Sequence, residues 1–177
     1  MRRLSLFAIP FLLAIVLMLV FRAVGMTVCT VEGDALSPQF IAGDRVLVNR
    51  WSYGLRIAGG PHFGYGRLWR QKVERGDLVA FDHPQTGEML LCRCKGLPGD
   101  TLQVEGKSLV VPSLKACADG DYYWMESLGR DKSQDSRLLG FVAEEHIIGR
   151  VIMVVYSHHP DSSLWKGWLG NRFMKSY

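Results

Sequence analysis

The sequence predicts an all-β domain that follows a single apolar N-terminal segment. Short runs of β-forming residues recur along the chain, and Gly-Asp, Pro-Gly and Gly-rich turns separate them. After the N-terminal segment the apolar residues show little helical periodicity, which favours an all-β architecture over a mixed one. The expected strands are the runs MTVCTVEG, VLVN, DLVAFD, MLLCRC, TLQVEGKSLVV and HIIGRVIMVVYS.

The N-terminal segment has the composition of a membrane anchor. Residues 4–21 carry no charge and approach the length that crosses a bilayer, and two arginines precede them. Small residues at 23–25 also fit a cleavable signal peptide, but the apolar run is longer than the centre of most signal peptides. We therefore expect residues 1–25 to be a single-pass anchor in the cytoplasmic membrane and residues 26–177 to form one extracytoplasmic domain.

Charge and cysteine content narrow the class of partner. The 177 residues carry a net charge of +4 with scattered basic residues, so we expect no nucleic-acid partner and a mild attraction to anionic membrane lipid. Four cysteines could pair in three ways, and the spacing of Cys92 and Cys94 is not a usual zinc pattern. We expect neither a metal nor a cofactor. The segment 56–72, rich in Gly and aromatic residues, is expected to be irregular, with contact to lipid as one interpretation.

Several motifs in a fixed order carry a family resemblance. Together they resemble the conserved boxes of bacterial type I signal peptidases, from about residue 28 to residue 151. The resemblance implies an all-β catalytic domain tethered by one or two N-terminal membrane helices. It also implies a serine-lysine endopeptidase that removes signal peptides from exported proteins. The motifs are VEGDALSPQFIAGDRVLVNRWSYG, ERGDLVAFDHP, CRCKGLPGD, RDKSQDSRLLGFV and IIGRV.

Both catalytic positions of the family hold other residues here. The family turn reads Gly-Asp-Ser-Met-x-Pro-Thr, so the resemblance places Ala35 at the nucleophile. The family lysine precedes Arg-x-x-Gly-Leu-Pro-Gly-Asp, which places Cys92 at the general base. A lysine in an apolar pocket can lose its charge and accept the proton of a serine, but an alanine methyl cannot attack a carbonyl. The family mechanism therefore cannot operate in this chain as written.

Displaced catalytic groups are an alternative that the sequence leaves open. Ser37 lies two residues after Ala35, although its place before Pro38 is typical of a turn hydroxyl. Lys95 lies three residues after Cys92, so on a strand the two side chains point to opposite faces. Cys92 could itself be a thiol nucleophile, but the motif contains no matched base to ionise it.

The resemblance also assigns supporting and binding residues. It places Ser133 at the serine that hydrogen-bonds the family lysine, and Asp135 and Arg137 at an ion pair that braces the site. An extended signal peptide would lie between two strands, residues 27–31 and residues 89–92. The expected substrate-binding residues are Val28, Cys29, Thr30, Val31, Gly33, Met89, Leu90 and Leu91.

The sequence thus predicts a membrane-anchored protein that resembles a signal peptidase and binds signal peptides without cutting them. Possible further partners are an active signal peptidase or the export machinery. Two alternatives remain. One is an active endopeptidase that uses Ser37 or Cys92. The other is an export-machinery scaffold with no peptide site, in which bulky side chains would fill the pockets beside Ala35.

Overall fold

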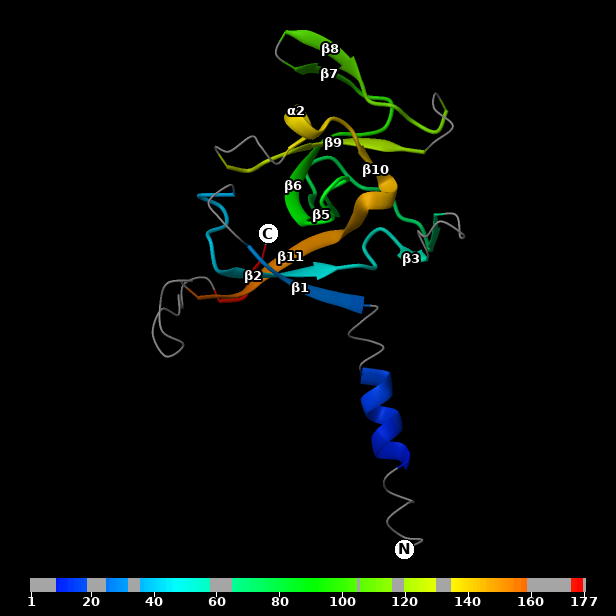
Figure 1. Cartoon of the computed structure of the whole chain (residues 1–177), viewed down its shortest axis with the longest axis vertical. Coiled ribbons are helices and arrows are strands. Elements are labelled where there is room, and N and C mark those ends of the chain that lie inside the picture. The colour runs from blue at the N-terminus through cyan, green and yellow to red at the C-terminus, as the bar shows by residue number, and fades with distance from the viewer. Residues whose placement is uncertain are drawn as a thin grey trace, which may run out of the picture.

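The computed structural model describes residues 9–18, 25–31, 36–57, 65–104, 106–115, 120–129, 135–158 and 173–176. A curled antiparallel sheet with the strand order β1-β2-β11-β5-β6-β9-β10 dominates the domain, and β12 pairs with β11 (Figure 1). Its strands are β1 (Met26–Thr30), β2 (Asp44–Asn49), β5 (Leu78–Asp82), β6 (Met89–Gly96), β9 (Tyr122–Glu126), β10 (Val142–Ala143), β11 (Ile147–Ser157) and β12 (Lys175–Ser176).

Two small ribbons and two short helical turns complete the described part of the β domain. Most predicted strands are present, and the run TLQVEGKSLVV folds into a hairpin that turns at Gly106. The segment 56–72 is less irregular than expected, because two paired strands lie within and beside it, while residues 58–64 lie outside the described part. The remaining elements are β3 (Leu55–Ile57), β4 (Gly66–Leu68), β7 (Thr101–Val104), β8 (Lys107–Val110), α2 (Ser136–Leu139) and η1 (Glu144–His146).

The curl of the sheet buries both faces of its central strands. On β5, Leu78 and Ala80 belong to an apolar cluster beneath β1, β2 and β11, whereas Val79 and Phe81 belong to a second cluster beneath β9. On β6, Leu91 joins the first cluster and Cys92 joins the second. Successive side chains of a strand point to opposite faces, so a strand buried on both sides reads as a continuous apolar run.

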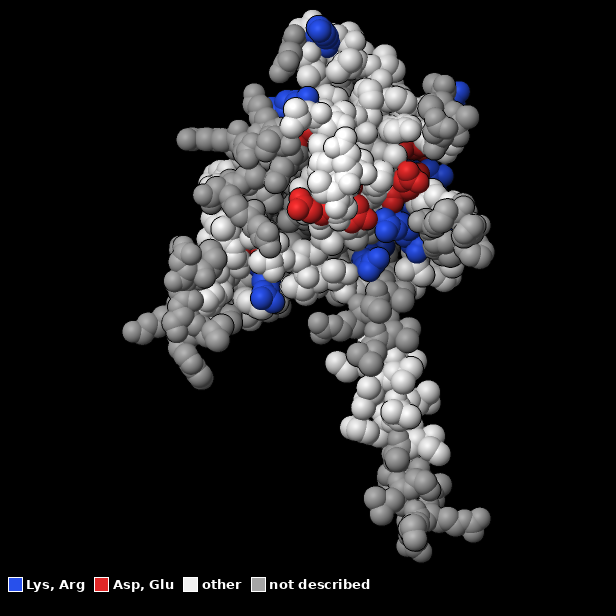
Figure 2. All heavy atoms as spheres, in the orientation of Figure 1, with Lys and Arg blue, Asp and Glu red and all other residues white. Residues whose placement is uncertain are grey.

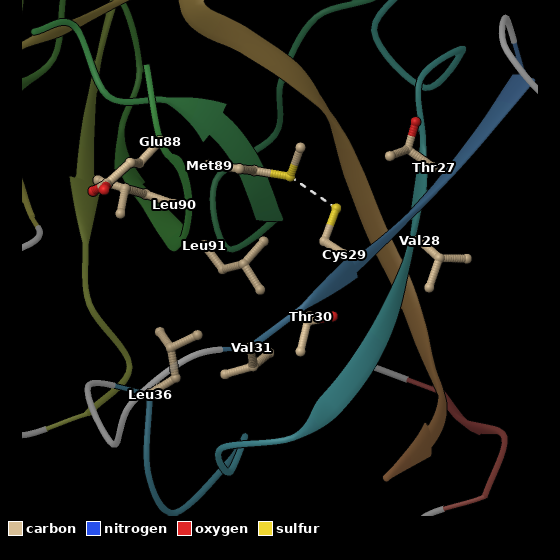
Figure 3. A pocket seen from close by; sticks show the side chains of 10 residues that line it. All are labelled: Thr27, Val28, Cys29, Thr30, Val31, Leu36, Glu88, Met89, Leu90 and Leu91. Carbon is tan, nitrogen blue, oxygen red and sulfur yellow. Dashed lines mark hydrogen bonds between the residues drawn. The ribbon is translucent and has the colours of Figure 1, made fainter. Parts of the chain in front are cut away.

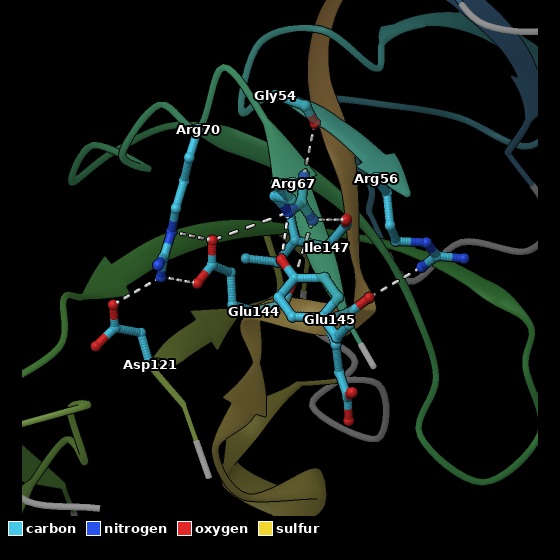
Figure 4. A network of polar contacts seen from close by, with 9 residues as sticks. Gly54, Arg56, Arg67, Arg70, Asp121, Glu144, Glu145 and Ile147 are labelled. Carbon is cyan, nitrogen blue, oxygen red and sulfur yellow. Dashed lines mark hydrogen bonds and ion pairs between the residues drawn. The ribbon is translucent and has the colours of Figure 1, made fainter. Parts of the chain in front are cut away.

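A buried arginine attaches the β3–β4 ribbon to this sheet. The Arg67 side chain is 1% exposed and donates hydrogen bonds to the carbonyl oxygens of Gly54, Glu144 and Ile147 (Figure 4). Arg70 pairs with the Glu144 carboxylate and, at 3.0 Å, with Asp121. The three carbonyl acceptors satisfy the buried guanidinium of Arg67. Its burial is therefore tolerated, and its hydrogen bonds fix the position of β4.

The N-terminal segment is helical over residues 9–18 and leaves the domain near the start of β1 (Figure 1). Within the part of the chain that the structure describes, no helix combines the length and the hydropathy required to cross a membrane.

The crossing of β11 over β2 predicts a strong requirement for glycine at position 149. A Cβ atom on Gly149 would lie 2.2 Å from the carbonyl oxygen of Asn49, and backbone atoms cannot move aside as a flexible side chain can. We expect Gly149→Ala to lower the free energy of unfolding by about 2–3 kcal/mol, measured by urea denaturation. Gly87→Ala is the control, because a Cβ there meets nothing within 4 Å. Its only cost is the strain of an alanine in the left-handed backbone conformation of Gly87. Equal losses in the two variants would contradict the steric argument.

Candidate functional site

A groove of about 490 Å³ lies between β1 and the start of β6 (Figure 3). The residues that the sequence predicts to contact a peptide line this groove, except Gly33, which lies outside the described residues. Thr27, from the predicted strand 27–31, completes the lining with Leu36 and Glu88, which were not predicted as contacts. The full set is Thr27, Val28, Cys29, Thr30, Val31, Leu36, Glu88, Met89, Leu90 and Leu91.

The outer edge of β1 has no strand beside it in the described part of the chain. The Val31 N–H donates to Asp44 at 2.8 Å, and the Gly25 carbonyl accepts from Arg50 at 3.1 Å. Backbone groups of alternate residues point to the same side of an antiparallel strand, so the odd-numbered residues of β1 bond to β2. The N–H and C=O groups of Val28 and Thr30 therefore point away from β2 and toward the groove.

The start of β6 has a matching open edge. The Glu88 carbonyl accepts from His83 at 2.7 Å, and the Cys94 N–H donates to Asp77 at 2.9 Å, so the even-numbered residues of β6 bond toward β5. The odd-numbered residues point the other way, and β9 pairs with β6 only from Arg93 onward. The backbone groups of Met89 and Leu91 therefore face the groove. The curled sheet resembles a barrel that lacks one strand, and the groove occupies the gap.

Apolar side chains form the floor at one end of the groove. Val31, Leu36 and Leu91 lie together there, and all three are buried (Figure 3). Toward the other end, the Cys29 thiol donates to the Met89 sulfur at 2.8 Å and joins the two walls. The floor of the groove is therefore apolar, and the space above it is open rather than filled by bulky side chains.

Cys92 lies outside the groove, on the face of β6 opposite Leu91. Its side chain is 1% exposed in the second apolar cluster. Burial first, and then the negative charge of Asp135, raise the pKa of the Cys92 thiol to about 12 against the opposing positive charge of Arg137. The thiol is therefore neutral at physiological pH and is a poor nucleophile.

The other candidate groups are dispersed. Lys95 is exposed, whereas Cys92 is buried, as the strand alternation predicts. Ser37 is half-buried in the turn that follows Leu36. Ala35 and Ser133 lie outside the described residues. Among the described residues that line the groove, Glu88 carries the one carboxyl group.

Asp135 and Arg137 form a buried support beside Cys92. The Asp135 side chain is fully buried and accepts hydrogen bonds from the Arg137 backbone N–H and Nε, both at 2.9 Å. It also accepts from the Ser127 N–H at 3.2 Å. Ser136, which sequence reasoning missed, accepts from the Met125 N–H at 2.8 Å and so attaches this turn to β9. The Asp-Ser-Arg pattern is typical of a helix N-cap and could have indicated this role.

Comparisons with known proteins place the sequence among signal peptidases. The family model described as "Signal peptidase, peptidase S26" matches residues 4–117 and 112–156. The chain is 27% identical to signal peptidase I of Leptolyngbya laminosa over 165 residues, covering 80% of this chain and 74% of that protein. It is 24% identical to signal peptidase I of Pseudomonas fluorescens over 204 residues, covering 84% and 70%. Signal peptidase I V of Bacillus subtilis is 27% identical over 149 residues, covering 67% and 79%.

Burial of Cys92 predicts that its thiol resists alkylation. In the folded protein near neutral pH, we expect iodoacetamide to modify Cys92 at least about 100-fold more slowly than in urea. The folded chain buries the thiol and leaves very little of it ionised to the reactive thiolate. Peptide mass spectrometry measures the modified fraction of each cysteine. Cys29 is the internal control, because it is half-buried at the groove and should react faster than Cys92. Faster modification of Cys92 than of Cys29 would restore it as a candidate nucleophile.

Proposed function

Because this chain belongs to signal peptidase family S26, we propose that it binds the signal peptides of exported preproteins between β1 and β6 and does not cut them. The observation that carries this proposal is the gap in the curled sheet. Two strand edges with outward backbone groups border it, and an apolar floor lies beneath it. An extended peptide in the gap would complete the row of backbone hydrogen bonds on both sides.

The groove supplies both affinity and selectivity for such a peptide. Val28 and Thr30 on one wall and Met89 and Leu91 on the other would exchange backbone hydrogen bonds with it. Each bond contributes about 0.5–1.5 kcal/mol, independent of the peptide's side chains. Alternate side chains of the peptide would face the buried floor, which suits the small residues expected at the end of a signal peptide. The open floor weighs against a scaffold without a peptide site.

The lack of cutting follows from the two replaced positions. By the family resemblance, Ala35 occupies the nucleophile position, and its methyl group cannot form an acyl intermediate. Cys92 occupies the position of the base, and its buried thiol holds its proton and faces away from the groove. The buried Asp135–Arg137 pair would then serve as structural support for the turn and β9, whether or not chemistry takes place nearby.

We place the protein at the cytoplasmic membrane, with residues 1–25 as a single-pass anchor and residues 26–177 as the extracytoplasmic domain. The uncharged run 4–21 behind two arginines supports this placement, as does the family. A peptide-binding protein at that surface would encounter preproteins as they emerge. An active signal peptidase or the export machinery would be its natural partner.

Proline at position 28 tests the proposed binding mode. The Val28 N–H points into the groove, so Val28→Pro removes a donor to the peptide and leaves the hydrogen bonds to β2 in place. We expect binding of a fluorescent signal peptide to the full-length protein in detergent to weaken about tenfold, measured by anisotropy. Val28→Thr is the control and should bind nearly as well as the parent. Unchanged affinity in the proline variant, with an unchanged thermal melt, would refute pairing along β1.

A cleavage assay tests the absence of catalysis. The full-length protein is purified until it is free of the host's own signal peptidase. We expect it to leave a preprotein intact in detergent or lipid while it still binds the signal peptide. Electrophoresis and mass spectrometry detect a cut at the signal-peptide boundary. Cleavage that disappears in Ser37→Ala or in Cys92→Ala would identify a displaced nucleophile and would replace the proposal with an active endopeptidase.

A further inference from the structure

A thiol and a thioether face each other across one end of the groove. The Cys29 Sγ on β1 donates its hydrogen to the Met89 Sδ on β6 at 2.8 Å, and both side chains point into the space between the two walls (Figure 3). Cys29 forms no disulfide and is half-buried, and Met89 is 37% exposed. Both sulfurs can therefore be reached from solvent through the groove that they line.

Strand alternation directs the two sulfurs to the same side of the gap. Cys29 lies two residues before Val31, and Met89 lies two residues before Leu91, so each side chain shares the face of its strand that joins the first apolar cluster. The two residues are 60 positions apart in the chain, and the curl of the sheet brings them together. The pair is thus a fixed feature of the folded groove.

This pair of donors suits a soft monovalent metal ion. Thiolate and thioether sulfur select Cu(I), whereas structural zinc sites use four ligands from Cys, His and carboxylates. Within the described residues no three His, Cys, Asp or Glu side chains gather where they could hold a metal, and no histidine lines the groove. Figure 2 shows acidic side chains beside basic ones on the face above the N-terminal helix, and these cations compete with a hard metal ion for the carboxylates.

We propose that the groove binds Cu(I) between the Cys29 Sγ and the Met89 Sδ. The Cys29 thiol releases its proton to solvent and its sulfur binds the ion, while the Met89 lone pair that now accepts the thiol hydrogen forms the second bond. Copper keeps its oxidation state. The flexible Met89 side chain can move away from Cys29 to admit the ion, because the groove beside it is open. The ion would then join β1 to β6 across the gap, whether or not the groove also binds a peptide.

Competition for Cu(I) tests this site in the full-length protein in detergent. The parent chain carries Cys117→Ser, because Cys117 lies outside the described residues and its thiol could take up copper elsewhere. Cu(I) is kept reduced by ascorbate without oxygen and is shared with bathocuproine disulfonate, whose absorbance measures the copper that the protein leaves. Cys29→Ser and Met89→Leu each remove one donor at nearly constant size. Met174→Leu is the matched control, because it removes a 60% exposed methionine just before β12. Circular dichroism verifies that every chain is folded.

We expect the parent and Met174→Leu to bind one Cu(I) with equal affinity. Met89→Leu should bind at least about tenfold more weakly, and Cys29→Ser should take no measurable copper from the competitor. X-ray absorption at the copper edge should find two sulfur neighbours in the parent and one in Met89→Leu. Equal affinity of the parent and Met89→Leu would overturn the proposal, since copper would then bind an isolated thiol. Parent-like affinity in Cys29→Ser would also overturn it, because the ion would lie outside the groove.

Discussion

Two-sided burial of β5 and β6 is the constraint on which the site depends. The sheet must curl to cover both faces of these strands, and the curl brings the outer edge of β1 toward the open edge of β6. Without it, the two edges would lie at distant places of a flat sheet. The groove is therefore a product of core packing, and Leu91 belongs both to the core and to the groove lining.

The same burial explains what a cysteine does at position 92. Desolvation disfavours a charged form of either sign, so an apolar site lowers the pKa of a lysine and raises the pKa of a thiol. A lysine in such a site becomes a useful neutral base, whereas the thiol of Cys92 becomes inert. One environment thus has opposite chemical consequences for the two residues. The Asp135–Arg137 pair lies beside Cys92. Its role as a support is the same for a lysine or a cysteine at position 92, because Asp135 accepts its hydrogen bonds from Ser127 and Arg137.

Much of the fold and of the groove lining could be predicted from sequence, because alternation and turn residues are local signals. The runs around β1, β5, β6 and β11 became strands as expected. The β3–β4 ribbon was missed, because its strands are short and Gly-rich and depend on the distant contacts of Arg67. The sequence could not predict the open backbone edge at Met89. That edge exists because β9 pairs with β6 only from Arg93 onward, and strand pairing between distant segments is not a local signal. Ser136 was missed for the same reason, because its partner is on another strand.

Arg67 also gives the domain a mechanical property. Its guanidinium on β4 joins the Gly54 carbonyl, just before β3, to the carbonyls of Glu144 and Ile147, where η1 leads into β11. A force applied at the neighbouring Trp69 turn is therefore carried into β11 and does not bend the ribbon as a loose flap. The turn after β4 is thereby tied to β11, which pairs with β2, and β2 pairs with β1 at the wall of the groove.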